Sequence, residues 1–230
     1  MIVVIGSPAG RLEDGRIVAG GPAARVAVAA AGGGRQVQVV GRVGDDPTAE
    51  AILLDLARAG VGHVAVLRDP SRPTPLEPAP PADDLVEGDD DGYGAGAEPI
   101  EAADRAVPAT PELATVLPLE GADVELGLRY LTDYRVIVVA DPAGRDVVGV
   151  AVEAARWGAA RLVLVTEAGA LVDDSLPADA TVIEAPTTDP DGAFAALVGL
   201  FAASLDEGSD PGDAFSGSLA AAGWTEASPD

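Results

Sequence analysis

The stretch that decides the fold runs from Gly20 to Asp46 and reads GGPAARVAVAAAGGGRQVQVVGRVGDD. A glycine pair and a proline open its Ala/Val-rich part and three glycines close it, which predicts a helix over residues 22–31. The β-branched residues that follow predict a strand over residues 37–40. The strand leads into a turn that carries two adjacent carboxylates, Asp45 and Asp46. A glycine-opened helix is therefore followed directly by a strand and an acidic turn.

Strands and helices alternate along most of the chain. The apolar pattern also predicts strands over 2–5, 63–67, 136–140, 162–165 and 181–183, and helices over 48–59, 123–131, 146–157, 192–205 and 211–222. This alternation predicts the α/β class, as a three-layer α/β/α sandwich with a mostly parallel sheet. Such sheets bind ligands outside the carboxyl ends of their strands. Asp45, Asp46, Asp141 and residues 187–191 all follow predicted strands, so we expect them near that edge.

The 230 residues suffice for one domain with a substantial core. The pattern breaks at about residues 69–111, where six prolines from Pro70 through Pro81 precede an acidic, Ala/Glu-rich stretch. A long segment with so little periodicity predicts a flexible acidic insertion. We therefore expect residues 1–230 to form a single domain that carries this insertion.

The chain is strongly acidic and lacks several reactive residue types. Its formal charge is −24, and all 14 basic residues are arginines. Such a charge repels phosphate backbones, so we expect no nucleic-acid partner. Without cysteine or lysine the chain has no disulfide, thiol nucleophile, cysteine zinc site, P-loop or Schiff base. Its one histidine, His63, begins an apolar stretch and is predicted to be structural, and no metal site is predicted.

No targeting or membrane signal accompanies this composition. The sequence contains no apolar run long enough to span a bilayer, so we expect no membrane partner. Residues 2–5 form an apolar strand with no basic n-region before it and no cleavage-site pattern after it. Secretion is therefore not indicated, and we expect a cytoplasmic protein.

The N-terminal block resembles the ribokinase-like, or PfkB, carbohydrate kinases. The resemblance rests on the Gly20-Gly21 helix start, on Val-Gly-Arg-Val-Gly-Asp-Asp at residues 40–46, and on a helix ending in Ala-Gly-Val at residues 59–61. These motifs are specific, and the resemblance covers residues 1–67 well. It implies a ribokinase-like fold. The family's lid of two to four strands is reduced here to a short hairpin or loop at residues 8–18, or absent.

The resemblance also implies where a substrate binds. In the family the Gly-Gly helix start faces the sugar, which makes Gly20 and Gly21 candidate substrate-binding residues. The family's sugar-binding Asp and Asn fall at Arg11 and Arg25 here. Two guanidinia at that helix start suit a ligand that bears a carboxylate or phosphate, and surface salt bridges are the alternative. Asp45 leaves two interpretations open: with Asp46 it binds a ribose hydroxyl or a metal, or the pair forms a solvent-facing turn.

The C-terminal half contains a segment that resembles the family's catalytic loop. Residues 185–194 read APTTDPDGAF and fall where the family has Asp-Thr-x-Gly-Ala-Gly-Asp-Ala-Phe. In the family the amides of this loop stabilise the developing phosphate charge, and its Asp is the general base on the sugar hydroxyl. On this alignment Asp191 is the catalytic base, and Gly192 and Ala193 belong to the anion hole. A second alignment uses Gly-Asp-Ala-Phe at residues 212–215 and makes Asp213 the base instead.

The same loop departs from the family pattern. Gly-Ala-Gly-Asp has become Asp189-Pro190-Asp191-Gly192, so the base position itself is a glycine and the proline removes one amide donor. Two carboxylates, those of Asp189 and Asp191, now lie where a polyanion would bind. The family's Asn-x-x-Glu element, linked to Mg²⁺ and phosphate, has no counterpart because the chain contains no asparagine.

The function that the resemblance implies is ATP-dependent phosphotransfer to a sugar or nucleoside hydroxyl, with ATP and Mg²⁺ as cofactors if the protein is active. The departures predict weak or no kinase activity, so the assignment as an enzyme stays open. The alternative is a non-catalytic protein that binds a small anionic metabolite or nucleotide, or a structural subunit on the same fold. Family lids often build dimer contacts, so a monomer and a homodimer both stay open.

Overall fold

Six parallel strands form the main sheet of the protein. The computed structural model describes residues 1–77, 119–170, 176–189 and 191–222. Within these ranges the strand order is β5-β4-β1-β6-β7-β8. The strands are β1 (Ile2–Ile5), β4 (Val37–Gly44), β5 (Val61–Asp69), β6 (Val136–Val139), β7 (Arg161–Thr166) and β8 (Thr181–Glu184). The four residues of β1 are completely or almost completely buried between β4 and β6, as the continuous apolar run predicted.

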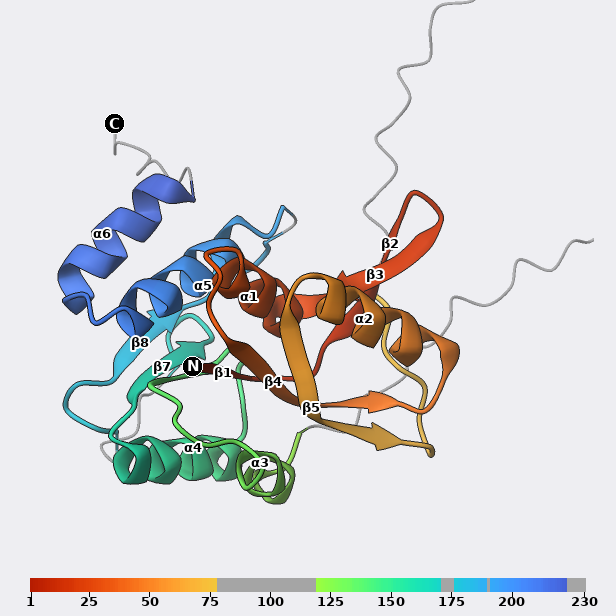
Figure 1. Ribbon diagram of the computed structural model, residues 1–230, viewed down its shortest axis with the longest axis horizontal. Helices are drawn as coiled ribbons and strands as arrows, with labels where there is room; N and C mark the ends of the chain where they lie inside the picture. Colours follow the sequence, from red (N-terminus) through yellow and green to blue (C-terminus); the bar gives the residue numbers. More distant parts are fainter. Residues whose placement is uncertain (78–118, 171–175, 190, 223–230) are drawn as a thin grey trace, which may run out of the picture.

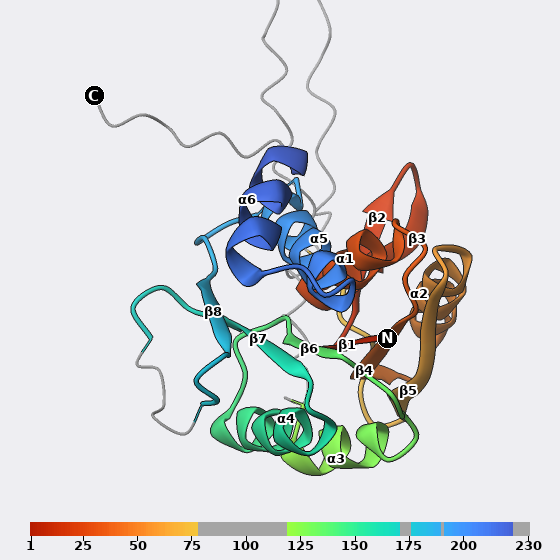
Figure 2. The ribbon, with the colours of Figure 1, turned by 60° about the vertical axis from the view of Figure 1, so that its left-hand side comes forward.

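Helices cover both faces of this sheet (Figure 1). One face carries α1 (Gly21–Ala31), α2 (Pro47–Arg58) and α5 (Ala193–Asp206), with α6 (Pro211–Ala221) packed on α5. The other face carries α3 (Gly121–Leu128) and α4 (Arg145–Gly158), which close a second apolar core. Figure 2 shows the sheet between these two layers. The predicted three-layer α/β/α fold is therefore confirmed, and the main sheet is entirely parallel.

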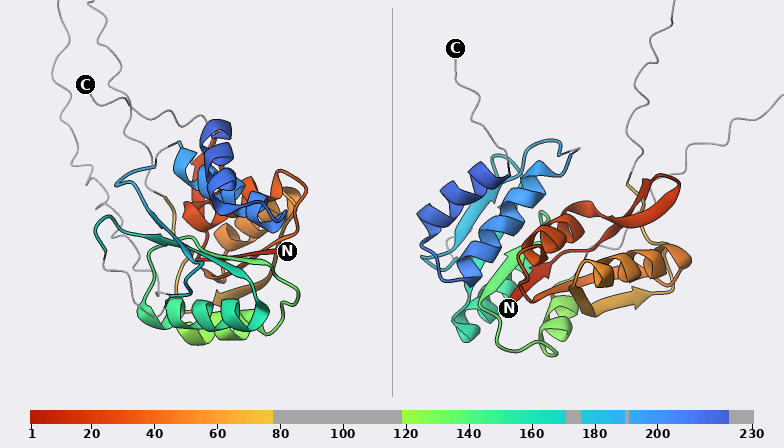
Figure 3. Two further views of the ribbon diagram at one scale, coloured as in Figure 1. Left: turned by 90° about the vertical axis from the view of Figure 1, so that its left-hand side faces the viewer. Right: turned by 45° about the horizontal axis from the view of Figure 1, so that its top comes forward.

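A separate antiparallel hairpin projects from the layered body (Figure 3). It consists of β2 (Ala9–Glu13) and β3 (Arg16–Gly20), which leave the carboxyl end of β1 and return to the start of α1. This hairpin occupies the region for which the sequence predicted a short hairpin or loop. It therefore lies beside the sheet edge at which ligands bind in parallel α/β folds.

Strand β4 is longer than the sequence predicted. The sequence predicted a strand over residues 37–40, but pairing with β5 continues to Gly44. Gly41 lacks a side chain because a Cβ there would lie 2.3 Å from the Gly6 carbonyl oxygen. The glycine thus permits close approach of two neighbouring strands and does not end one.

The segment after β5 packs against the hairpin over residues 70–77. Leu76 forms a parallel bridge with Gly10 of β2, and Thr74 is 5% exposed. These residues belong to the predicted insertion at 69–111, whose remaining part lies outside the described residues. No helix in the described ranges is long and apolar enough to span a membrane.

Candidate functional site

The first component of the candidate site is the N-terminal end of α1. Gly20 precedes the helix in an extended conformation, and Gly21 has a φ of 78°, which glycine adopts without strain. A Cβ on Gly20 would meet the Arg11 side chain at 2.8 Å and the Glu77 carboxyl carbon at 3.1 Å. The glycine pair therefore lets two other segments approach the helix start closely. The structure places Gly20, Gly21, Arg11 and Arg25 at this end of α1, and their role in substrate binding stays a prediction.

Arg25, one turn into α1, connects this helix to two loops. Its Nη2 donates to both carboxylate oxygens of Glu77, at 3.1 and 2.8 Å, and its Nη1 donates to the Asp189 carbonyl at 2.8 Å. Glu77 also accepts a hydrogen bond of 2.6 Å from the Gly21 amide. The two side chains are about one-fifth exposed. A carboxylate does bind at this helix start, but it belongs to the protein itself. Sequence reasoning missed Glu77 because nothing local to residue 77 indicates the contact.

The N-terminal end of α5 is likewise occupied by a carboxylate of the chain. The Asp189 side chain accepts hydrogen bonds from the Phe194 and Ala195 amides, both at 3.0 Å. The Gly192 amide donates to the Asp189 carbonyl at 3.2 Å. Asp189 thus engages the amide of Gly192, one of the two predicted anion-hole residues, and the two amides that follow Ala193. A phosphate group would have to compete with Asp189 for these donors.

The position that corresponds to the family's catalytic base is unsuited to an aspartate. Gly192 has a φ of 72°, and a Cβ there would lie 3.2 Å from Cδ of Arg25. The neighbouring Asp191 is exposed, and Ala193 begins α5. Asp213, the base of the second alignment, lies exposed in the first turn of α6, a helix that packs on α5. Of the two candidate bases, only Asp191 lies in the loop that Arg25 contacts.

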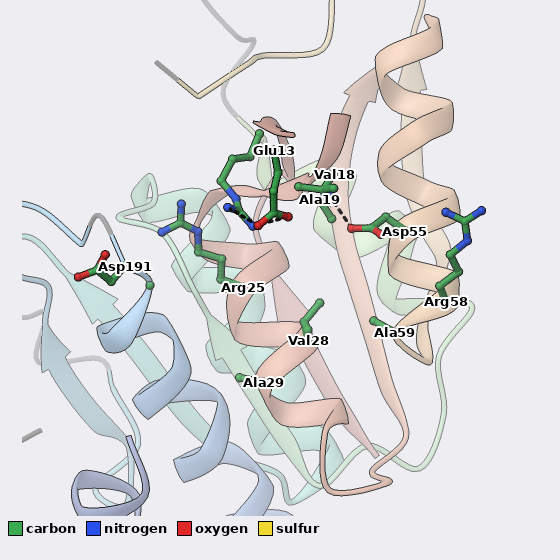
Figure 4. Close-up of a pocket in the computed structure, with 12 residues that line it drawn as sticks. Glu13, Val18, Ala19, Arg25, Val28, Ala29, Asp55, Arg58, Ala59 and Asp191 are labelled. Carbon is green, nitrogen blue, oxygen red and sulfur yellow. Dashed lines mark hydrogen bonds and ion pairs between the residues drawn. The ribbon is translucent and has the colours of Figure 1, made fainter. Parts of the chain in front are cut away.

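A groove of about 760 Å³ runs along the outer side of α1 (Figure 4). The hairpin, α2 and the Asp191–Gly192 pair form its other walls. Six charged residues line it: Arg11, Glu13, Arg25, Asp55, Arg58 and Asp191. Because three are cationic and three anionic, the groove has no excess of positive charge for a polyanion.

Two predicted substrate-binding side chains have local partners. Arg11 donates to both oxygens of Glu13 at 3.4 Å, and these side chains are 39% and 52% exposed. Asp45 pairs with Arg68 at 3.1 Å on the surface. Asp46 begins α2 and accepts hydrogen bonds from the Ala49 amide and from the Thr74 amide and hydroxyl. The arrangement favours the interpretation of Asp45 and Asp46 as a turn over the interpretation as ligand-binding residues.

Asp141 is a carboxyl group that the sequence analysis placed at this edge without assigning it a role. It follows β6, and its Oδ2 would lie 2.6 Å from a Cβ on Gly6, which follows β1. Asp141 and Ser7 line a cavity of about 160 Å³ that also reaches Gly144 at the start of α4. Burial raises the pKa of Asp141 to about 6. A buried carboxyl group with a raised pKa therefore lines a small cavity at the carboxyl ends of β1 and β6.

The site does not fit a magnesium–nucleotide complex. The α5 amides that would receive phosphate are held by Asp189, and Asp191 adds a second carboxylate to the same loop. Within the described ranges, no group of three or more His, Cys, Asp or Glu side chains is arranged to hold a metal ion. Asp189 thus occupies the Phe194 and Ala195 amides at the α5 start, and the two carboxylates of the loop oppose the charge of a triphosphate.

Comparison with protein-family models matches residues 3–78 to the pfkB family carbohydrate kinases. This segment contains the hairpin, the α1 start, β4 with its acidic turn, and the residues up to Glu77. No curated protein matches the chain at the level of sequence.

Solved structures of sugar and nucleoside kinases share the fold. Ribokinase from Arabidopsis thaliana, complexed with ribose and ATP, is 15% identical, with a TM-score of 0.59 over 96% of this chain and 90% of that chain. Fructokinase from Vibrio cholerae O395 is 14% identical, with a TM-score of 0.57 over 96% and 95% of the two chains. Aminoimidazole riboside kinase from Salmonella enterica is 14% identical, with a TM-score of 0.58 over 96% and 90%.

At these identities the structural likeness shows a common fold, and the family-model match adds the sequence motifs of the N-terminal third. The parallel sheet, the glycine-opened α1 packed against α5 and the reduced hairpin are consistent with both. The chain therefore has a ribokinase-like fold, and its N-terminal third, residues 3–78, matches the pfkB family carbohydrate kinases.

Proposed function

We propose that this protein binds a small metabolite on the ribokinase-like fold and does not transfer phosphate. The observation that carries the proposal is the α5 start, where Asp189 holds the Phe194 and Ala195 amides and a glycine stands at the base position. Sugar kinases of this fold need those amides for phosphate and a carboxylate at that position for the sugar hydroxyl. Both requirements conflict with the arrangement in this chain.

The energetic consequence of this arrangement is large. One preorganised oxyanion donor typically contributes about 10²–10³-fold to the rate, and a positioned general base about 10²–10⁴-fold. Loss of both removes at least roughly 5 kcal/mol of transition-state stabilisation, because each tenfold change corresponds to about 1.4 kcal/mol.

The proposed binding role rests on the cavity beside Asp141, at the carboxyl ends of the strands. The cavity there measures about 160 Å³ and is lined by Ser7, Asp141 and the start of α4. Cavities for drug-sized ligands are typically about 300–1,000 Å³, so this one suits a compound no larger than a monosaccharide. A carboxyl group that titrates near pH 6 can donate to or accept from a ligand hydroxyl. The ribose in the Arabidopsis complex supports a sugar-like class of ligand.

A second candidate, ATP-dependent phosphorylation of a sugar or nucleoside, is favoured by one observation. Asp191 lies one residue before the family's base position and lines the groove beside Arg25 and Gly192. In that case Asp191 would act as the base. Asp191→Asn would then abolish turnover with little change in stability, because the side chain is exposed.

A thermal-shift screen separates the two candidates. The protein is titrated with ATP and ADP, each with and without Mg²⁺, and with a panel of monosaccharides and nucleosides. Ligands that bind only the folded state raise Tm in proportion to ln(1 + [L]/Kd). The proposal predicts no shift with nucleotide and a saturable shift with at least one sugar-like compound, lost in Asp141→Ala. A nucleotide-dependent shift would favour the kinase, and no shift with any compound would overturn the binding role.

The oligomeric state is part of the same proposal. The hairpin leaves Leu12 63% exposed, whereas most large apolar side chains of the two cores are buried. We propose a homodimer that buries this side chain between two hairpins. Size-exclusion chromatography with light scattering would give the dimer mass for the wild type and the monomer mass for Leu12→Asp, and a monomeric wild type would contradict the homodimer.

A further inference from the structure

The cavity beside Asp141 contains a single charged group in largely apolar surroundings. Among the described residues that line it, Asp141 is the only charged one and Ser7 carries the only hydroxyl group. The other lining residues are glycine, alanine, proline and aliphatic side chains. Within the described ranges no hydrogen bond or ion pair joins the Asp141 carboxyl group to another residue, and burial alone raises its pKa. The part of the chain that the structure describes therefore supplies no partner for this carboxylate.

Arg42, a cation close to this cavity, is committed to other carboxylates. Its amide donates to the Ser7 hydroxyl oxygen at 3.1 Å, which places its backbone beside the cavity. Its guanidinium donates to both carboxylate oxygens of Asp123 at 2.7 Å and lies 3.8 Å from an oxygen of Asp69. Neither Asp123 nor Asp69 lines the cavity, so Arg42 neutralises charge elsewhere.

The start of α4, which forms another wall of the cavity, has a carboxylate of its own. Asp146 lies in the first turn and accepts hydrogen bonds from the Gly121 amide, at 2.7 Å, and from amides of that turn. Its charge offsets the positive end of the helix. Arg145, the first residue of α4, is exposed and is not among the residues that line the cavity. The start of α4 thus leaves the charge of Asp141 uncompensated.

Two neighbouring residues keep the Asp141 carboxylate accessible to a ligand. Gly6 has a φ of 154°, and a Cβ there would lie 2.6 Å from Oδ2 of Asp141. Any side chain at Gly6 would therefore press against the carboxylate and reduce the cavity. Ser7 accepts a hydrogen bond from the Arg42 amide and so keeps its own hydroxyl hydrogen for a ligand oxygen. The cavity thus offers one anionic acceptor and one hydroxyl donor.

We infer that this cavity selects a small hydroxylated amine, of the amino-sugar class, whose ammonium group pairs with Asp141 and whose hydroxyl oxygen accepts from Ser7. The inference names the ligand class of the proposed binding site and rests on the proposed function. An ammonium group supplies the positive charge and the N–H donors that the buried carboxylate lacks, whereas a neutral sugar leaves that charge uncompensated. Ca²⁺ takes about six to eight oxygen ligands and Mg²⁺ needs octahedral coordination, but the lining side chains offer only a carboxylate and a hydroxyl group.

Isothermal titration calorimetry with matched ligands tests this selectivity. Glucosamine differs from glucose by an ammonium group in place of one hydroxyl group, and N-acetylglucosamine carries the same nitrogen without its charge. Salt at about 0.15 M screens the general attraction of a cation to the acidic surface. At pH 7 glucosamine should bind at least about tenfold more tightly than either neutral sugar, because hydrogen bonds between charged groups are the stronger ones.

Proton linkage provides a second readout of the same ion pair. Asp141 has a pKa of about 6, so it is mostly ionised at pH 7 and mostly protonated at pH 5. The affinity for glucosamine should therefore fall roughly 5–10-fold between pH 7 and pH 5, whereas the affinity for glucose should change by less than about twofold. At pH 5.5 each bound glucosamine should displace roughly 0.5–0.7 proton, measured from how the binding enthalpy depends on the ionisation enthalpy of the buffer.

Two variants assign these effects to one side chain. Asp141→Asn keeps the shape of the side chain and removes its charge. In this variant glucosamine and glucose should bind within about twofold of each other, and proton release should disappear. Glu153→Gln makes the same change in charge at an exposed position of α4 and should alter neither the preference nor the proton release.

Equal affinities for glucosamine and glucose in the wild type would overturn the inference, as would a preference for glucosamine that survives in Asp141→Asn. If neutral sugars bind equally well and Asp141→Ala abolishes their binding, the proposed function stands without the inference. Absence of binding by every compound overturns both. Failure of the inference and failure of the proposed function are therefore distinguishable.

Discussion

At the scale of single residues, two carboxylates and one guanidinium decide what the site can hold. Glu77 lies at the start of α1, Asp189 at the start of α5, and Arg25 contacts both segments. Each helix start is a natural anion site, and each is filled from within the chain. Arg25 and Glu77 thus satisfy each other at the start of α1, and Asp189 caps the start of α5.

Asp189→Ala tests the role of Asp189 as the cap of α5. The substitution leaves the Phe194 and Ala195 amides without their acceptor, and loss of a capping side chain typically costs about 0.5–2 kcal/mol. We expect a fall of this size in the free energy of unfolding from urea denaturation. The exposed neighbour provides the control, because Asp191→Ala should change it by less than about 0.5 kcal/mol. Equal effects of the two substitutions would refute the capping role.

Asp141 should make stability depend on pH in the direction opposite to most carboxylates. Burial raises its pKa to about 6 in the folded state, above the unfolded value of about 3.9. The folded protein therefore binds more protons than the unfolded chain between about pH 4 and pH 6, and this group lowers the free energy of unfolding as pH rises through that window.

Asp141→Asn removes this charge, so it should stabilise the protein by up to about 3 kcal/mol at pH 7.5 and by less at pH 5. Urea denaturation of both proteins at the two pH values measures the difference. A variant whose advantage stays constant between the two values would contradict the elevated pKa.

At the scale of elements, Asp46 joins α2 to the segment of residues 74–77 that follows β5. Burial works to raise its pKa, but hydrogen bonds from Thr74 and Ala49 outweigh burial and hold the pKa below its usual value. The stabilisation from the ionised group is therefore present above the unfolded pKa of about 3.9 and is lost as pH falls through the lower folded pKa. The carboxylate at this turn positions both a helix and the segment that carries Glu77.

Asp46→Ala should lower the free energy of unfolding by about 2–4 kcal/mol, because it removes a helix cap and leaves the buried Thr74 without its acceptor. Asp45→Ala is the matched control at the adjacent position. Its exposed pair with Arg68 contributes at most about 1 kcal/mol. Urea denaturation compares the two, and similar losses would contradict the distinct roles of the adjacent carboxylates.

The elements themselves could be predicted because their signals are local. The Gly-Gly-Pro start of α1, the apolar run of β1 and the periodic helix after Asp46 all depend on neighbours in sequence, and the structure has each of them. The end of β4 was predicted too early because the reason for Gly41 is a contact with Gly6, far away in the chain. Glu77 escaped prediction for the same reason: its partners lie more than fifty positions away.

At the scale of the whole molecule, the acidic composition affects stability. The chain carries 38 acidic and 14 basic residues, so like-charge repulsion opposes the compact state. Added salt screens this repulsion, since the Debye length falls from about 10 Å at 0.1 M to about 3 Å at 1 M. We expect Tm to rise between 0.05 and 1 M NaCl. A Tm that falls over this range would show that ion pairs such as Arg42–Asp123 outweigh the net charge.

The ribokinase-like fold could be inferred from the sequence because the Gly-Gly helix start and the Val-Gly-Arg-Val-Gly-Asp-Asp turn are both present within residues 20–46. The groups that bind at the starts of α1 and α5 could not be predicted, because they depend on how α1 packs against α5 and the hairpin. The residue types alone indicated only that the site departs from the family pattern. Asp191 and Gly192 lie in the loop before α5, beside Arg25, and Ala193 begins that helix. Their catalytic roles stay a prediction.

ADP release tests the absence of phosphotransfer most directly. Purified protein is incubated with ATP, Mg²⁺ and a panel of sugars and nucleosides in a coupled assay, beside an Asp191→Asn variant and an enzyme-free control. If Asp189 and Gly192 have removed the kinase chemistry, wild type and variant release ADP at the enzyme-free rate with every acceptor. Acceptor-dependent ADP release by the wild type that Asp191→Asn abolishes would contradict the account.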